Sequence, residues 1–499
     1  MKINTEALKF ILGSKIRQLR QQLKMPLKAL SEKSGLSISY LSEIEKGKKY
    51  PKPEKLFHIS NALNVSFDDL VSLKTEDEGN PISAILNSPF LNELPLQEFG
   101  ISMTEIFELA NNAPSKASAF IQTLLEIGRN YDLQVEHFLL ASLRSYQKMH
   151  LNYFADLEKQ AQQFLRRRLK KQIPSPSLLE QILLNEYDVL VTYKDFSDGG
   201  ELSNLRSIWI EDKHQTIVIN CKLNAEQKMF ELAKEIYYRI HDLQERPISS
   251  TWMQVKSFEQ VHNNFSASYF AGAVLLPEKQ IVADITSFLK LKNWHPQKLE
   301  NIMAQYPTTP EMFLYRLSQL IPHHFGITQM HYMRIQNEPG SNSFHLTKEL
   351  NTTDVFVPRG IGPHEHHCRR WASIQLLEKL AQKQAKGENP NMLIAAQRSQ
   401  FHDQDGTFFN IAIARPLNIE TDKNSGMTLG FRIESNFKDT AGFWNDSDLP
   451  HMQVHETCER CPLSEAACQD RAAPPSIYMA QQKQRSKAEK LKDFIQQQL

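Results

Sequence analysis

Four of the five cysteines in this chain of 499 residues lie in its last 132 residues, in a pattern that could hold a metal centre. Two residues separate Cys458 from Cys461, six more precede Cys468, and Cys368 lies 90 residues before Cys458. Thiolates two residues apart can bind one metal centre, a third can join them from the next turn, and the fold can bring in a fourth. We therefore predict a metal site formed by Cys368, Cys458, Cys461 and Cys468.

Two other interpretations of these cysteines stay open. His364, His366, His367 and His455 could supply a nitrogen ligand, so a zinc site of three cysteines and one histidine fits the same segments. The thiols could also be free in a loop. Five cysteines are too few for a disulfide framework. Cys221, at the end of an apolar stretch, is expected to be simply buried.

A second group of residues has the composition of a DNA-reading surface. Within residues 26–47, Gly35 can supply a turn with positive φ, and Ser37 can cap the helix that follows. Leu41 and Ile44 would face inward on that helix, which leaves short polar side chains and an aromatic ring for the major groove. The predicted base and phosphate contacts are Arg17, Lys28, Ser37, Ser39, Tyr40, Glu43, Lys46, Lys48 and Lys49.

The stretch Tyr40-Leu-Ser-Glu-Ile-Glu-Lys-Gly47 resembles the signature of the Xre/lambda-repressor family, which implies a helix-turn-helix domain that binds double-stranded DNA. The charge agrees with this resemblance, because residues 9–74 hold 13 Lys and Arg against 6 Asp and Glu in a chain of net charge +1. A helical interaction module without DNA binding is the alternative. Because one such head reads only a half-site, we expect a homodimer.

The middle of the chain resembles the ImmA/IrrE metallopeptidase-like family without its metal ligands. That family places two zinc-binding histidines at i and i+4 on one helix, with a glutamate between them as general base. The matching stretch, residues 230–238, keeps Glu235 but has Lys234 and Tyr238 at the ligand positions. The third, acidic ligand falls on Ser266. A cationic lysine cannot bind zinc, so we expect a degenerate domain and no enzymatic activity.

The elements that must position these residues indicate a multidomain chain. We expect an all-α helix-turn-helix head, a helical middle, an α+β degenerate metallopeptidase-like domain and an α+β C-terminal sensory domain with the cysteine cluster. The expected boundaries are 9–73 for the head, 74–82 for a linker, 83–173 for the helical region, 178–325 for the degenerate domain and 327–499 for the sensory domain. Strands are expected near 187–193, 215–220, 408–413 and 427–433, and helices near 225–241, 266–290, 371–385 and from 478 onward.

The head, the degenerate domain and the cysteine pattern, taken together, resemble the short-chain fatty acyl transcriptional regulators, which control propionate and glyoxylate-cycle genes. The resemblance rests on the head, the degenerate domain, and a Cys-x2-Cys-x6-Cys pattern followed by Arg471-Ala-Ala-Pro-Pro475. It implies acyl-CoA as effector and, in at least some members, a [4Fe–4S] cluster on the C-terminal cysteines. No short motif identifies the acyl-CoA contacts.

The helical stretch at 138–168 has an aromatic face and a cationic end, which suit an acyl group and phosphates. The same side chains suit an ordinary core and a solvated helix end. The candidate effector contacts are Tyr146, Tyr153, Arg166, Arg167 and Arg168.

The leading hypothesis is a cytoplasmic transcription factor whose partners are double-stranded DNA, a short-chain acyl-CoA and a second copy of the chain. The alternative is a stress or prophage-type regulator whose peptidase-like half is a protein-interaction module. No membrane partner is expected, because no apolar run approaches the roughly 20 residues that span a bilayer. The first residues also lack the layout of a secretory signal.

Overall fold

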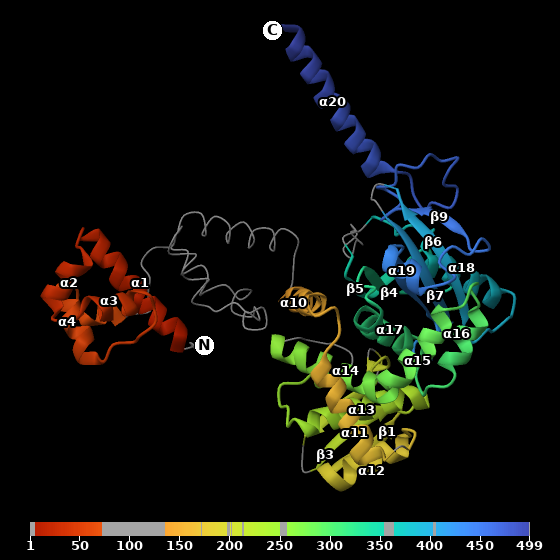
Figure 1. Cartoon of the computed structure of the whole chain (residues 1–499), viewed down its shortest axis with the longest axis horizontal. Coiled ribbons are helices and arrows are strands. Elements are labelled where there is room, and N and C mark those ends of the chain that lie inside the picture. The colour runs from red at the N-terminus through yellow and green to blue at the C-terminus, as the bar shows by residue number, and fades with distance from the viewer. Residues whose placement is uncertain are drawn as a thin grey trace. The chain divides into compact units, whose positions relative to one another are not determined.

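The computed structural model describes residues 5–71, 135–170, 172–196, 200, 202–211, 214–249, 257–353, 364–402 and 406–498 (Figure 1). The chain divides into two compact units, residues 1–146 with 255–258, and residues 147–254 with 259–499. The expected linker at 74–82 and most of the helical region at 83–173 lie outside the described residues. Within the part of the chain that is described, no helix has the length and apolarity to cross a membrane.

Residues 5–71 form a small helical head. Its helices are α1 (Thr5–Gln22), α2 (Leu27–Ser34), α3 (Ile38–Glu45), α4 (Pro53–Leu63) and α5 (Phe67–Val71). Gly35 ends α2 with a φ of 70°, and the hydroxyl of Ser37 accepts a hydrogen bond from the Tyr40 amide at the start of α3. The predicted turn at Gly35 and the predicted helix cap at Ser37 are both confirmed. The core of the head is formed by Leu12, Ile16, Leu30, Leu41, Ile44, Leu56, Ile59, Leu63 and Leu70.

The first part of the second unit is an α+β arrangement around a small sheet. Its strands are β1 (Val189–Lys194), β2 (Ser207–Glu211) and β3 (Gln215–Asn220), in the order β1-β3-β2, with β1 parallel and β2 antiparallel to β3. The expected strands at 187–193 and 215–220 are thus β1 and β3. The preceding helices are α10 (Val135–Met149, whose first residues belong to the other unit), α11 (Ala155–Phe164), the π-helical turn η1 (Leu165–Leu169) and α12 (Pro176–Tyr187).

Helices follow this sheet. Asn224 and Gln227 form a capping box at the start of α13 (Ala225–Ile240), which matches the helix expected near 225–241. The prediction of a single helix at 266–290 is wrong. Two helices occupy it, α14 (Phe258–Leu275) and α15 (Glu278–Leu289), because Pro277 lacks an amide proton and begins the second. They are followed by α16 (Pro296–Met303) and α17 (Pro310–Phe325).

A larger sheet forms the C-terminal part of this unit, in the order β5-β4-β8-β7-β6-β9. Its strands are β4 (Met330–Asn337), β5 (His345–Asn351), β6 (Leu393–Phe401), β7 (Thr407–Pro416), β8 (Asn424–Arg432) and β9 (His451–Val454). Tyr332 lies in the core formed with α15, α16 and α17, whereas Met333 lies in the core formed with α18 (Ala372–Ala385). Helices therefore cover both faces of the sheet.

The last helices complete the chain. A short helix, α19 (Ser435–Thr440), follows β8, and α20 (Ser476–Gln498) extends away from the sheet to the C-terminus (Figure 1). The apolar side chains near the end of α20 are exposed, with Leu491 at 58% and Phe494 at 59%.

Candidate functional site

The N-terminal end of α3 presents the predicted base contacts. Ser37 and Ser39 are exposed, and their hydroxyl oxygens lie 3.3 Å apart. The side chain of Ile38, which the sequence prediction omitted, is 47% exposed beside them. Leu41 and Ile44 are fully buried on the opposite side of the helix, so this face cannot turn inward. Hydroxyls next to an aliphatic side chain suit base edges and thymine methyl groups.

Most of the predicted basic contacts are exposed. Lys28, Lys46 and Lys48 are exposed, and Arg17 is half-buried on α1. The exposed Lys49 binds the Glu43 carboxylate at 2.8 Å, and this contact raises the pKa of Lys49 and lowers the pKa of Glu43.

The ring of Tyr40 lies beside two lysines. The ammonium nitrogens of Lys49 and Lys55 lie 5.7 and 4.3 Å from the centre of its ring. Lys55, on α4, is a further phosphate-contact candidate that local sequence could not reveal, because the contact depends on how α4 packs beside α3. The two lysines orient the aromatic ring without DNA present.

Two contacts fix the position of α3 against α1. Arg20 donates hydrogen bonds to both carboxylate oxygens of Glu45, at 2.7 and 2.9 Å, and a third to the Met25 carbonyl at 2.9 Å. A Cβ atom at Gly13 would lie 2.0 Å from the Ile44 carbonyl oxygen, so only glycine permits this helix crossing.

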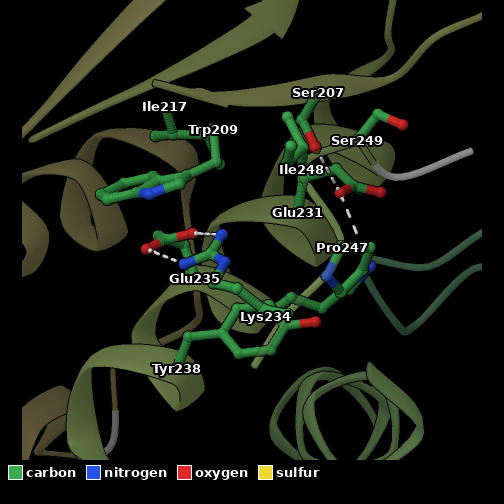
Figure 2. Close-up of a pocket in the computed structure, with 11 residues that line it drawn as sticks. Ser207, Trp209, Ile217, Glu231, Lys234, Glu235, Tyr238, Pro247, Ile248 and Ser249 are labelled. Carbon is green, nitrogen blue, oxygen red and sulfur yellow. Dashed lines mark hydrogen bonds and ion pairs between the residues drawn. The ribbon is translucent and has the colours of Figure 1, made fainter. Parts of the chain in front are cut away.

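The peptidase-like site on α13 is closed by ion pairs (Figure 2). Arg246 donates to both oxygens of Glu235, one at 2.8 Å, and Arg239 contacts the same carboxylate at 3.0 Å. The two guanidinium groups lie 4.6 and 4.5 Å from the ring centre of Trp209. The cavity beside these residues has about 20 Å³, enough for one water molecule but not for a peptide.

The other positions of the peptidase pattern are also buried. The Lys234 ammonium lies 3.9 Å from Glu231, which accepts a hydrogen bond from Ser207 at 2.8 Å, and burial lowers the pKa of Lys234. The Tyr238 hydroxyl donates to Asn264 at 3.2 Å, and Ser266 is buried on α14. None of these three positions carries a zinc-binding side chain.

The four predicted cysteine ligands are buried, each with 4 or 5% of its surface exposed. Two segments far apart in sequence bring them together: the Cys368 amide donates to the Glu456 carbonyl at 3.2 Å, and the Cys458 amide to the His366 carbonyl at 2.9 Å. A turn then places the Cys461 amide 3.3 Å from the Cys458 carbonyl. The Ala472 amide donates to the sulfur of Cys458 at 3.3 Å.

These cysteines and the arginines near them affect one another electrostatically. Burial raises the pKa of Cys368 to about 12, and the neighbouring Cys458 and Cys461 add to the rise. Arg369 lies within electrostatic reach of Cys458 and Cys368, and Arg370 within reach of Cys468. Among the residues the structure describes, no three His, Cys, Asp or Glu side chains are arranged so that they could hold a metal ion.

Cys221 does not behave as expected. It is exposed, in the turn that follows β3, because the strand ends at Asn220. The prediction that it is buried is wrong.

The candidate effector residues are spread over several environments. The Tyr153 hydroxyl donates to Glu278 at 2.8 Å, and its ring stacks on His323 with 3.7 Å between ring centres. Arg166 and Arg167 are exposed in η1, and Arg168 binds Glu186 at 3.0 Å. Tyr146 belongs to the other compact unit. The structure therefore shows no single pocket lined by these five residues among those it describes.

Comparison with known proteins identifies two domains. Residues 16–70 match the family described as helix-turn-helix. The head is an Xre-type helix-turn-helix domain. Residues 184–318 match the family described as the IrrE N-terminal-like domain, so the peptidase-like region of the sequence is an IrrE-like domain.

The relatives of the helix-turn-helix domain are regulators. Over 58 residues the chain is 40% identical to an uncharacterized HTH-type transcriptional regulator found in two strains of Mycobacterium tuberculosis. The match covers 12% of this chain and 41% of the relative, so the chain spans about two fifths of the length of the curated relatives it matches. These matches support a DNA-binding regulator.

Two solved structures are similar over larger parts of the chain. A Mycobacterium tuberculosis transcriptional regulator, 16% identical, covers 66% of this chain and 92% of its own, with a TM-score of 0.45. The apo form of ComR from S. Thermophilus, 17% identical, covers 56% of this chain and 99% of its own, with a TM-score of 0.13.

Proposed function

We propose that this protein is a sequence-specific, DNA-binding transcription regulator that acts as a homodimer. The N-terminal end of α3 supports this proposal, because Ser39 and Ile38 are exposed there and the half-buried Tyr40 lies beside Lys49 and Lys55. Selection of bound duplexes from a randomised DNA pool by the full chain should yield a two-fold symmetric site. Binding to that site that is unchanged when Ser39, Tyr40 and Glu43 are all replaced by alanine would disprove the assignment.

The IrrE-like domain has a structural role in this proposal. Glu235 is held by Arg246 and Arg239, and the adjoining cavity of about 20 Å³ has no room for a substrate. We assign the domain no peptidase activity.

We also propose an iron–sulfur cluster in the C-terminal region, on the resemblance given above and on the chemistry of its four cysteines, although the described side chains are not arranged as a metal site. The four thiols are buried, a backbone amide donates to the sulfur of Cys458, and Arg369 and Arg370 lie within electrostatic reach of the cysteines. Cys368, Cys458, Cys461 and Cys468 would hold the cluster, which when bound supplies redox or oxygen sensitivity. Zinc on three cysteines and a histidine is the alternative.

A short-chain acyl-CoA is the proposed effector. The proposal rests on the resemblance given above, since the five candidate contacts do not share one pocket. Acetyl-CoA or propionyl-CoA should raise the melting temperature and change operator affinity, and by linkage the operator must change acyl-CoA affinity by the same factor. Arg167→Glu should weaken CoA binding and leave ligand-free DNA binding intact. If no acyl-CoA shifts melting or operator binding, a protein-interaction role for the IrrE-like domain replaces metabolite sensing.

A further inference from the structure

A cavity of ligand size lies in the C-terminal part of the second unit, between α18 and the loop that joins β4 to β5. Its volume is about 610 Å³, which is within the range of pockets that bind small molecules. None of the five candidate effector contacts lines it. Among the described residues that do line it, none is a lysine, an arginine or a histidine.

One wall of this cavity is a single face of α18. The lining residues Glu378, Ala381, Gln382 and Ala385 occupy positions i, i+3, i+4 and i+7, which lie on one side of a helix. Two of the four are alanines, whose side chains are single methyl groups. The wall is therefore recessed beside Glu378, the carboxylate on the same face.

The opposite wall is the loop between Asn337 and Phe344, and Arg369 holds this loop in place. The Arg369 guanidinium donates at 2.6 Å to the backbone carbonyl and to the side-chain oxygen of Asn342. The same guanidinium lies 4.4 Å from the ring centre of Phe344, which is buried in the core beneath α18. The wall is thus formed before any ligand binds, which lowers the entropic cost of binding.

Two hydrogen-bond acceptors in the lining have no donor. The Asn337 side chain is 3% exposed, and its amide nitrogen donates to the Glu338 carbonyl at 3.2 Å, but its Oδ1 accepts no hydrogen bond. The half-buried Glu378 carboxylate forms no hydrogen bond or ion pair with the residues that the structure describes, and burial raises its pKa. Since buried polar groups are normally paired, the lining lacks a donor.

We propose that this cavity binds a small amphipathic amine, a molecule with an apolar body and a primary ammonium group. An ammonium has three N–H donors and a positive charge, so it matches Glu378 and the Oδ1 of Asn337. The apolar body would lie against Phe344, Ala381 and Ala385. A carboxylate or phosphate would meet the charge of Glu378 and no cation among the described lining residues. The site therefore differs from one for an acyl-CoA, and it does not depend on the DNA-binding assignment.

The test compares phenethylamine with hydrocinnamate, which are similar in size and opposite in charge, by calorimetric titration of the full chain. The wild type should bind the amine about tenfold more tightly or better, the contribution expected of one hydrogen bond to a charged group. Glu378→Gln should weaken amine binding about tenfold and strengthen hydrocinnamate binding, an opposite pair of changes that a structural defect would not produce. The matched control Glu489→Gln, at an exposed position on α20, should bind both probes as the wild type does.

Filling the cavity provides the second arm of the test. Ala381→Phe should abolish amine binding, and if that variant does not fold, Ala385→Phe on the same face of α18 is measured with the same expectation. Equal affinity of the wild type for the two probes, or no amine binding at millimolar concentration, would overturn the proposal. Unchanged amine affinity in Glu378→Gln, or in the cavity-filling variant, would also overturn it.

Discussion

Arg20 holds Glu45 through both carboxylate oxygens, and this pair joins the last turn of α1 to the last residue of α3. The Glu45 side chain is 7% exposed and that of Arg20 is 15% exposed, so water screens the pair only weakly. The hydrogen bonds to Glu45 raise the pKa of Arg20. The pair thereby fixes the orientation of α3 against α1.

Arg20→Met should loosen α3, because it leaves Glu45 buried without its main partner. Removing one member of a buried ion pair costs about 3 kcal/mol, which corresponds to roughly 100-fold faster hydrogen exchange in α3 if exchange occurs through local opening. Exchange in the full chain followed by mass spectrometry measures this. Arg20→Met/Glu45→Met should recover part of the protection, and unchanged protection in Arg20→Met would contradict the role of the pair.

Tyr40→Ala should reduce affinity for the selected operator by about 1–3 kcal/mol while affinity for unrelated DNA changes little. Tyr40→Phe keeps the ring between Lys49 and Lys55 and serves as the matched control. Lys48→Ala should instead weaken all duplexes alike and lower the slope of log affinity against log salt by about one. Titrations at several salt concentrations distinguish these effects, and a sequence-specific loss in Lys48→Ala would count against a phosphate role.

Glu235→Gln should leave the protein without zinc and without peptidase activity, as in the wild type, and should lower its melting temperature. The substitution replaces a carboxylate that binds Arg246 and Arg239 with a neutral amide. The expected effect is therefore a loss of folding stability. Glu338→Gln, at an exposed position, is the control. Stoichiometric zinc in the wild type, together with loss of regulation in Glu235→Gln, would overturn the structural role.

Protein purified without oxygen should contain iron and sulfide and absorb broadly in the visible range. Cys458→Ser, Cys461→Ser and Cys468→Ser should each abolish the absorption, and Cys368→Ser should do so if Cys368 is the fourth ligand. Cys221→Ser, at an exposed position, should leave it unchanged. Zinc at one equivalent with no iron would point to the structural site with three cysteines and one histidine.

The stability of the ligand-free protein should rise with pH above 7 through Lys348. The folded chain releases the Lys348 proton near pH 7, whereas an unfolded lysine keeps it to about pH 10.4. The unfolded chain therefore binds more protons between these values, so the stability lost at low pH returns as pH rises. The melting temperature of Lys348→Met minus that of the wild type should shrink from pH 6.5 to 9. A constant difference would contradict the low pKa.

Local patterns in the sequence predicted the helix-turn-helix domain well. The Gly35 turn, the Ser37 cap and the buried positions of Leu41 and Ile44 depend on residues within a few positions of one another. The same holds for α13, whose capping box lies within four residues. The exposed position of Ile38 was missed, because an apolar residue at the start of a helix is ordinarily assigned to the core.

Relationships between distant segments could not be predicted in this way. The Arg246 contact with Glu235, and the meeting of residues 366–368 with 456–458, depend on loops whose paths the sequence does not specify. The opposition of Arg334 and Lys348 depends on strand register, and a shift of one residue would place Lys348 on the other face. The chemistry of these sites therefore depends on which residues the fold brings together from distant segments.

The start of α20 is anchored beside the cysteine segment. The amides of Ile477 and Tyr478, at the start of this helix, both donate at 3.0 Å to the carbonyl of Glu459, the residue directly after Cys458. The helix has 23 residues, so it is about 34 Å long. Each degree of tilt at Glu459 moves the far end by about 0.6 Å over that length. A rotation of α20 about Glu459 therefore displaces Phe494 and Ile495, near its far end, much further than the residues beside the cysteines.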